Sequence, residues 1–245
     1  MAYASVNSVY EIVKRVANKD NRGFIRPADF NAYARQAQLD VFHEILGEYK
    51  FAQVSRRRQL QFRDGNYNSI ENIKDDLRPL VVYAKTLKYG YPNSAFVLPE
   101  DYAYYINLEF EGSGIEVVAP EDINSYLGSF DGAPTDSTPI ASFINNGVLV
   151  FPDTIDYDVK LTYYKNPQGS TTTGAASILA PTWAYNTVAG QPVYNASATI
   201  NFELPKHLES RLANRVLSYI GIEIREPELF QAAEKQEADQ KTARQ

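Results

Sequence analysis

The chain has 245 residues, 44% of them hydrophobic and 22% charged, which is enough for one large domain or two small ones with a real core. It contains no cysteine, which excludes disulfides, thiolate nucleophiles and cysteine-based zinc sites. The net charge of −6 is uneven: residues 1–65 carry 11 Lys/Arg against 7 Asp/Glu, and residues 66–200 carry 6 against 15. The acidic middle disfavours tight nucleic-acid binding there, whereas the basic start suits an acidic partner or the acidic part of a neighbouring copy.

Two N-terminal helices are expected. Residues 5–19 have Ser5 as a candidate N-cap and a helical apolar stripe, formed by Val6, Val9, Ile12, Val13 and Val16. Pro27 suits the first position of a second helix and Asp29 its first turn. That helix is expected to carry an apolar face to residue 49, made of Phe30, Ala34, Ala37, Val41, Ile45 and Tyr49. The following "RRRQLQFR" suits a short strand or a helix tail, and "ENIKDDL" (71–77) a short helix.

From Leu80 onward the pattern predicts β-strands. Five segments have β-branched and aromatic residues near a period of two, between turn residues: 80–89, 102–111, 114–119, 145–153 and 157–165. "EGSGIE" (111–116) indicates a hairpin turn, and "PEDINSYLGS" (120–129) a short helix that begins at Pro120. A mostly antiparallel β-region with a helical insert is therefore expected.

Residues 166–200 contain no charged residue and are rich in Ser, Thr, Gly and Ala. Such a long uncharged segment is unusual inside a compact domain. Two interpretations stay open: an extended arm or β-hairpin with "VAGQ" (188–191) as its turn, ordered against a neighbour, and a flexible loop.

The C-terminal part returns to helix. Pro205 is expected to begin a helix with an apolar stripe over Leu208, Leu212, Val216 and either Tyr219 or Ile220, and Gly221 to end it. Pro227 begins a last helix whose apolar residues, Leu229 and Phe230, are followed by a polar stretch with little core to bury.

The expected fold class is α+β: a helical bundle from the N- and C-terminal helices, plus a mostly antiparallel β-region with a short helical insert and an extended arm. The expected parts are an N-terminal helical part (1–78), the β-region (79–165), the arm or hairpin (166–200) and the C-terminal helices (201–245), which complete the bundle and dock.

No catalytic motif is found. His43 and His207 lie in predicted helices, outside any metal-binding pattern, and no Walker, GxSxG or GxGxxG motif occurs. The adjacent carboxylates Asp75–Asp76, Glu100–Asp101 and Glu121–Asp122 lie at helix starts or in loops, where a structural role is favoured. We expect no enzyme activity, cofactor or metal.

Three consecutive arginines occupy positions 56–58. Two interpretations stay open: a face that forms ion pairs with an acidic neighbouring protein, and a run of charges exposed to solvent.

The N-terminus lacks the pattern of a signal peptide, and apolar runs such as 80–84 are too short to cross a bilayer. A soluble protein without a membrane partner is expected.

Four stretches in this order are similar to the ring or adaptor proteins that join portal to tail in short-tailed bacteriophages, especially the crAss-like phages. They are "FNAYARQAQLDVFHEILGEY", "VLPEDYAYYINLEF", "GVLVFPDTIDYDVKLTYYKNP" and the segment 200–238, in which "FELP" and "GIEIREPEL" are the most specific pieces. The resemblance implies a structural virion protein at the head–tail junction, assembled in the host cytoplasm as a closed homo-oligomeric ring, commonly of twelve copies.

The same resemblance implies contacts with the portal and adjacent tail proteins, and a channel through which genomic DNA passes without sequence-specific binding. An acidic lining would repel the phosphates of that DNA. The residues expected to contact other proteins are Arg56, Arg57, Arg58, Trp183, Tyr185, Tyr194, Leu229 and Phe230. The last helix (227–245) is expected to dock on a neighbouring ring or the portal.

Two rival functions remain open. One is a carbohydrate-binding β-module that uses Tyr102, Tyr104 and Tyr105, although strand alternation would put Tyr105 on the face opposite the other two. The other is a carboxylate-dependent glycosidase of a phage tail, which needs two acids across a cleft.

Overall fold

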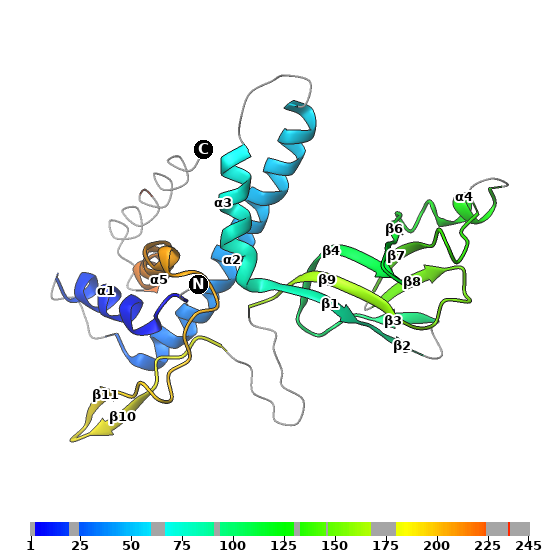
Figure 1. The fold of residues 1–245 in the computed structure, drawn as a ribbon. Coiled ribbons are helices and arrows are strands. Elements are labelled where there is room, and N and C mark those ends of the chain that lie inside the picture. Colours follow the sequence, from blue (N-terminus) through cyan, green and yellow to red (C-terminus); the bar gives the residue numbers. More distant parts are fainter. Residues whose placement is uncertain are drawn as a thin grey trace. The chain divides into compact units, whose positions relative to one another are not determined.

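The computed structural model describes residues 3–19, 25–59, 67–90, 94–129, 133–145, 147–167, 180–223 and 235. The chain divides into two compact units (Figure 1). The helical unit combines residues 1–80 with 172–245, and the β-unit comprises residues 81–171. The fold class is α+β with N- and C-terminal helices, as the sequence predicted. In the described part of the chain, no helix combines the length and apolar character that crossing a membrane requires.

The helical unit is a small bundle. It contains α1 (Val6–Lys19), α2 (Pro27–Gln59), α3 (Tyr67–Leu77) and α5 (Glu209–Glu223), with the short 3-10 turns η1 (Arg78–Leu80) and η2 (Lys206–Leu208). Helix α5 packs against both α1 and α2, and α3 packs against α2. Most residues of the predicted apolar stripes supply this core: Val9, Val13, Phe30, Val41, Ile45, Leu212 and Val216 are all fully buried. Two members of the stripe predicted for α1, Ile12 and Val16, are instead exposed.

The start of α1 is completed by the C-terminal part of the chain. Ser5 is its N-cap, as predicted, because its hydroxyl accepts a hydrogen bond from the Ser8 N–H (3.3 Å). The N–H of Ser5 donates to Glu209 (2.9 Å), and the N–H of Val6 donates to Asn201 (3.2 Å). Segments about 200 residues apart therefore satisfy the free donors at one helix end.

Several helix boundaries differ from the prediction. Helix α3 begins at Tyr67 rather than at residue 71, the helical insert begins at Ile123 rather than at Pro120, and α5 begins at Glu209, after the turn η2, rather than at Pro205. Helix α2 continues to Gln59, so the stretch after Phe51 begins as a helix tail rather than a strand. Helix α5 does not end at Gly221 but continues to Glu223. Glycine inside a helix costs about 1 kcal/mol relative to alanine, and the packing of α5 against α1 and α2 outweighs that cost.

The β-unit contains two sheets. One has the order β1 (Val81–Thr86), β9 (Val159–Lys165), β4 (Tyr102–Phe110) and β5 (Ser113–Gly114). The other has the order β2 (Lys88–Gly90), β3 (Ala95–Val97), β8 (Gly147–Phe151), β7 (Ile140–Ile144) and β6 (Glu116–Val117). Only the β6–β7 pair is parallel among these described strands, and the helical insert is α4 (Ile123–Leu127). Buried residues of both sheets form one core cluster, including Phe96, Leu108, Val148 and Leu161.

Strands β3 and β7 were not predicted. Strand β3 has only three residues, too few for a visible period. The first three residues of β7 (140–142) are all buried, so its sequence lacks the alternation of a half-exposed strand.

The predicted alternation along β4 is also wrong. The pairing of β4 with β9 shifts register between Tyr102 and Tyr104 and again between Tyr105 and Asn107. As a result, Tyr102 and Tyr105 both pack against the ring of Phe143, with centroids 6.0 and 5.0 Å away. A β-bulge moves side chains between faces in this way, and period-two counting cannot predict it.

Candidate protein-interaction site

A β-hairpin extends from the helical unit. It consists of β10 (Tyr185–Val188) and β11 (Gln191–Tyr194), joined by Ala189 and Gly190. Both turn residues have positive φ, 49° and 81°, as the two-residue turn of a tight hairpin requires. The predicted turn at "VAGQ" is thereby confirmed, and this part of the neutral segment is a hairpin.

Trp183 forms the base of this hairpin and is only 4% exposed. Its indole ring lies 4.3 Å from the ring of Tyr10 on α1, and its Nε1–H donates to Oδ1 of Asn7 (2.9 Å). Asn31 of α2 pairs with the backbone of Trp183: it accepts from the N–H (2.8 Å) and donates to the carbonyl oxygen (3.2 Å). Tyr185 and Tyr194, opposite each other across the strands, stack on the same indole. The base is therefore fixed to two helices.

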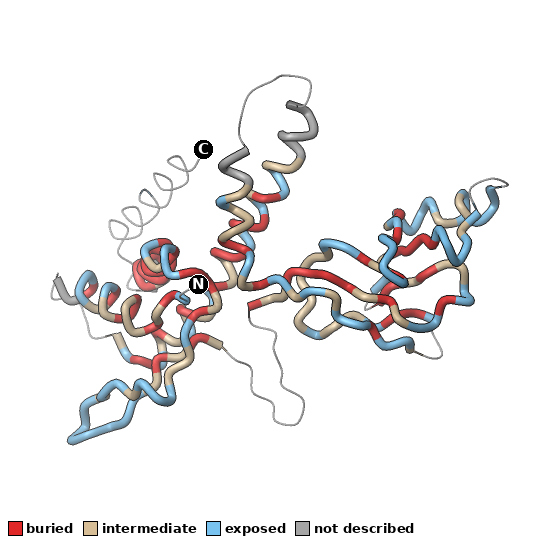
Figure 2. The backbone as a smooth tube through the Cα atoms, in the orientation of Figure 1, coloured by how far each residue is buried: buried red, intermediate tan, exposed pale blue. Residues whose placement is uncertain are grey.

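Beyond its base the hairpin is almost entirely exposed, as the pale-blue tube of Figure 2 shows. Val188 is 57% exposed and Val193 is 49% exposed, and no residue between Lys165 and Glu203 is charged. A two-stranded hairpin without a packed face is marginally stable by itself in water. The hairpin therefore exposes the apolar side chains of Val188 and Val193 to solvent, while its base stays fixed to the helices.

The other residues expected to contact partners do not join this site. Arg56, Arg57 and Arg58 belong to the last turns of α2, and their side chains lie outside the described part of the structure. Leu229 and Phe230 also lie outside the described residues, as does the rest of the last helix expected over 227–245 except residue 235. The structure therefore brings together Trp183, Tyr185 and Tyr194.

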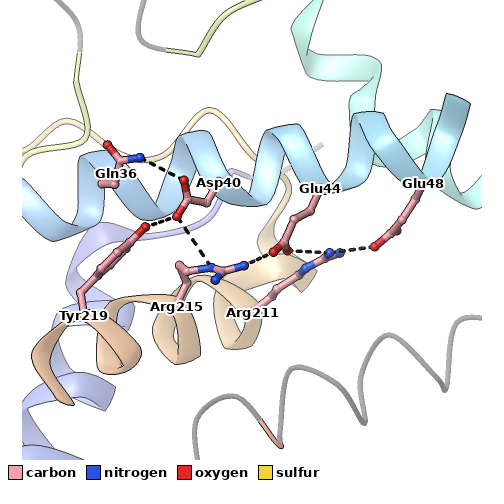
Figure 3. A network of polar contacts seen from close by, with 7 residues as sticks. All are labelled: Gln36, Asp40, Glu44, Glu48, Arg211, Arg215 and Tyr219. Carbon is pink, nitrogen blue, oxygen red and sulfur yellow. Dashed lines mark hydrogen bonds and ion pairs between the residues drawn. The ribbon is translucent and has the colours of Figure 1, made fainter. Parts of the chain in front are cut away.

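An ion network joins α2 and α5 (Figure 3). Arg211, 5% exposed, donates through one nitrogen to Glu44 (2.9 Å) and Glu48 (2.8 Å). Arg215 forms ion pairs with Glu44 and with Asp40 (3.9 Å). The carboxylate of Asp40 also accepts hydrogen bonds from the side chains of Tyr219 and Gln36. The second guanidinium nitrogen of Arg211, Nη1, is buried and makes no hydrogen bond with any described residue. The network fixes how α5 lies on α2, because each carboxylate accepts from an α5 side chain.

Three of the adjacent carboxylates singled out in the sequence have separate structural partners. Asp75 pairs with Arg78, and the buried Asp76 pairs with His207. Asp101 accepts from the hydroxyl of Tyr163 (2.8 Å). In the described residues, no group of three or more His, Asp or Glu side chains is placed to hold a metal ion.

Two tyrosines of the β-unit, the buried Tyr163 and the partly buried Tyr102, have perturbed acidity. Burial and the hydrogen bond to Asp101 raise the pKa of Tyr163 well above its usual range. Burial raises the pKa of Tyr102 to about 12. Both phenols therefore stay protonated near neutral pH, and they pack against each other with centroids 5.8 Å apart.

The β-unit also has a small pocket of about 270 Å³, lined by Phe110, Glu111, Asp136, Thr154, Ile155 and Tyr157. The Tyr157 hydroxyl donates to Glu111 (3.4 Å), and the Thr154 hydroxyl donates to Asp136 (2.7 Å). The charge of Glu111 raises the pKa of Tyr157, and the further carboxylates Asp136 and Asp156 act in the same direction. The pocket is therefore lined by negatively charged side chains and by aromatic rings.

Sequence reasoning missed the asparagines that fix the hairpin base and the α2–α5 ion network. Asn7 and Asn31 have low helix propensity, which is too weak a signal to indicate a partner. The network left a clearer signal: Asp40, Glu44 and Glu48 are spaced four apart, as are Arg211 and Arg215, so each set lies on one helix face.

Comparison with known protein families finds no family that matches the chain, and no functionally curated protein is significantly similar to it.

Proposed function

We propose that this chain is a structural subunit of a phage head-to-tail connector, which assembles into a closed ring between portal and tail around the DNA channel. The resemblance of the four sequence stretches suggests this role. The single observation that carries it is the hairpin at residues 185–194, whose base is fixed by Trp183 and whose apolar side chains are exposed.

The hairpin suits contact with another protein subunit better than any internal role. Its strands lack a packed face of their own, so a neighbour that covers Val188 and Val193 would gain the free energy of burying apolar surface. A fixed base lowers the entropy that such docking must overcome, because the element is already positioned. Each copy in a ring presents one surface and receives another, so a projecting element that enters the next copy is the expected geometry.

The charge of the β-unit supports a channel role. Its 91 residues contain four lysines and 12 aspartates or glutamates, a net charge of −8. A surface of this sign repels phosphates, so DNA would pass it without being bound.

The test is the oligomeric state of the purified chain, measured by native mass spectrometry and by electron microscopy. We expect a closed ring. The variant Val188→Ser/Val193→Ser should weaken assembly while leaving the helical unit folded, because both side chains are exposed.

A control is Tyr83→Ser in β1, which removes a still more exposed side chain from the β-unit (77% exposed). Assembly of this control should equal that of the wild type. A wild-type chain that stays monomeric at all concentrations, alone and with portal protein, would overturn the proposed function.

A further inference from the structure

The β10–β11 hairpin extends from the helical unit, and its two outer edges present different backbone groups (Figure 1). Along an antiparallel pair of strands, opposite residues alternate between pairs that hydrogen-bond to each other and pairs whose N–H and C=O groups point outward. The N–H of Asn195 donates to the carbonyl oxygen of Ala184 (2.9 Å), so that pair is a hydrogen-bonded one. Counted from it along the register, the outward-pointing residues are Tyr185 and Thr187 on β10, and Pro192 and Tyr194 on β11.

Of these two edges, only that of β10 can accept a further strand along its whole length. Proline has no N–H, so the β11 edge lacks a donor at Pro192. Tyr185 and Thr187 each keep an outward N–H and C=O, two positions apart, and no hydrogen bond in the described part of the chain occupies these groups. All four residues of β10 are exposed. The β10 edge is therefore open to strand addition.

The strand edges of the β-unit are protected against such pairing. Strand β1 is bulged at Ala84, which has a φ of 47°, and carries Lys85 next to the bulge. Strand β4, which β5 covers only at one end, has two register shifts. Strands β2, β5 and β6 and the uncovered ends of β7 and β8 have at most three residues each. Bulges, lysines and short length all disfavour edge pairing. Among the described strands, β10 alone offers an edge of four residues without charge, proline or bulge.

We propose that β10 pairs with β10 of a second copy, antiparallel and about a two-fold axis. The two edges are complementary, because Tyr185 of each copy then lies opposite Thr187 of the other and these two pairs exchange four backbone hydrogen bonds. A charged strand would oppose pairing with itself, and no residue between Lys165 and Glu203 is charged. The occupant is a second β10 because this strand has the one unprotected edge among the described strands of the chain.

This contact goes beyond the proposed ring and uses a different surface of the hairpin. The register places Val188 and Val193 on one face, where a neighbour in the ring would cover them, whereas the strand pair uses backbone groups at the edge. A two-fold contact joins two copies and closes on itself, so it adds no subunit to a ring. Between assembled rings, it would join two of them face to face.

Single cysteines test the strand pair in the full chain, which has no cysteine of its own. The two-fold axis places Asn186 opposite Asn186 of the other copy in a non-hydrogen-bonded pair, with Cα atoms about 4.5 Å apart and within reach of a disulfide. Asn186→Cys should therefore give a disulfide-linked dimer under mild oxidation, read on a non-reducing gel. Val188→Cys is the matched control on the same strand and face, because the axis separates its two copies by about 14 Å along the strand. Its dimer yield should be at least about tenfold lower.

Thr187→Pro tests the backbone edge itself. The N–H of Thr187 points away from β11, so the hairpin should tolerate proline there as it does at Pro192. Two intermolecular hydrogen bonds are lost, and Asn186→Cys/Thr187→Pro should cross-link at least about tenfold less than Asn186→Cys. Thr187→Val keeps the N–H and should cross-link fully in the same background. Trp183 fluorescence checks that the hairpin base stays intact, and if its emission shifts, the two cysteine variants decide.

The outcomes distinguish this contact from the ring. Equal cross-linking of Asn186→Cys and Val188→Cys would overturn the strand pair, as would full cross-linking of Asn186→Cys/Thr187→Pro with unchanged Trp183 emission. Neither result affects the ring, in which neighbouring copies hold equivalent residues a subunit width apart. A chain that cross-links at position 186 but forms no ring, even with portal protein, would contradict the ring and support the strand pair.

Discussion

The side chain of Asn31 makes two hydrogen bonds with the backbone of Trp183. It accepts from the Trp183 N–H (2.8 Å) and donates to the Trp183 carbonyl oxygen (3.2 Å). An amide side chain can imitate a neighbouring strand in this way, because it carries both an N–H donor group and a carbonyl acceptor. The residues are 152 positions apart. This pair joins the neutral segment to α2 and fixes where the hairpin begins.

Replacing Asn31 by alanine should loosen the hairpin base. Two hydrogen bonds are lost and the buried backbone groups of Trp183 are left without partners, which costs about 1–3 kcal/mol. Trp183 is the only tryptophan, so its fluorescence emission should shift to the red as water reaches the indole. Amide hydrogen exchange over residues 182–195 should accelerate as well. Asn124→Ala in α4 is the control, and an unchanged emission in Asn31→Ala would contradict this account.

The hairpin turn should be stabilised by Ala189→Asn. Ala189 has a φ of 49°, a conformation that costs an L-residue roughly 1 kcal/mol and that asparagine adopts more readily. The resulting Asn-Gly pair is the preferred sequence for this type of turn. Slower amide exchange in β10 and β11 would confirm the effect. Gly190→Val should do the reverse, since φ is 81° there.

The ion network between α2 and α5 should be strongly coupled. Arg211→Met removes one partner of Glu48 and one partner of Glu44, which should cost about 3–5 kcal/mol in chemical denaturation. Adding Glu48→Gln to this variant should cost less than the same change in the wild type, with a coupling of about 0.5–3 kcal/mol. The exposed pair Arg78–Asp75 is the control: Arg78→Met should cost at most about 1 kcal/mol. Strictly additive effects of Arg211→Met and Glu48→Gln would refute the coupling.

Stability should fall at alkaline pH because of Tyr163 and Tyr102. Folding raises the pKa of both phenols above the ordinary value of 10.0, that of Tyr102 to about 12. Below pH 10 both are protonated in the folded and unfolded chain, so they add no pH dependence. Above pH 10 the unfolded chain loses these protons first, and the free energy of unfolding therefore decreases as the pH rises.

The measurement is urea unfolding from pH 8 to pH 12. The variants Tyr163→Phe and Tyr102→Phe should each show a shallower decline above pH 10 than the wild type. Their curves should run parallel to that of the wild type below pH 9. An identical slope above pH 10 in all three proteins would show that these phenols do not account for the alkaline loss.

Local patterns predicted the elements that depend on nearby residues. The apolar stripes of α1, α2 and α5, the Ser5 cap and the "VAGQ" turn each follow from the spacing or backbone preference of a few consecutive residues. The same reasoning failed at Gly221 and along β4. There the outcome depends on packing of α5 and on pairing with β9, which involve distant parts of the chain.

The sequence by itself thus determined the α+β class, the helices, most of the strands and the uneven charge, because these depend on composition and short-range periodicity. Only the tertiary structure decided that Trp183 is buried against Tyr10, that Asn7 and Asn31 fix the hairpin base, and that Arg211 joins Glu44 and Glu48. It also brought Glu111, Asp136 and Tyr157 to one pocket. Each of these contacts joins residues far apart in the chain, and short-range spacing carries no information about which distant residues meet.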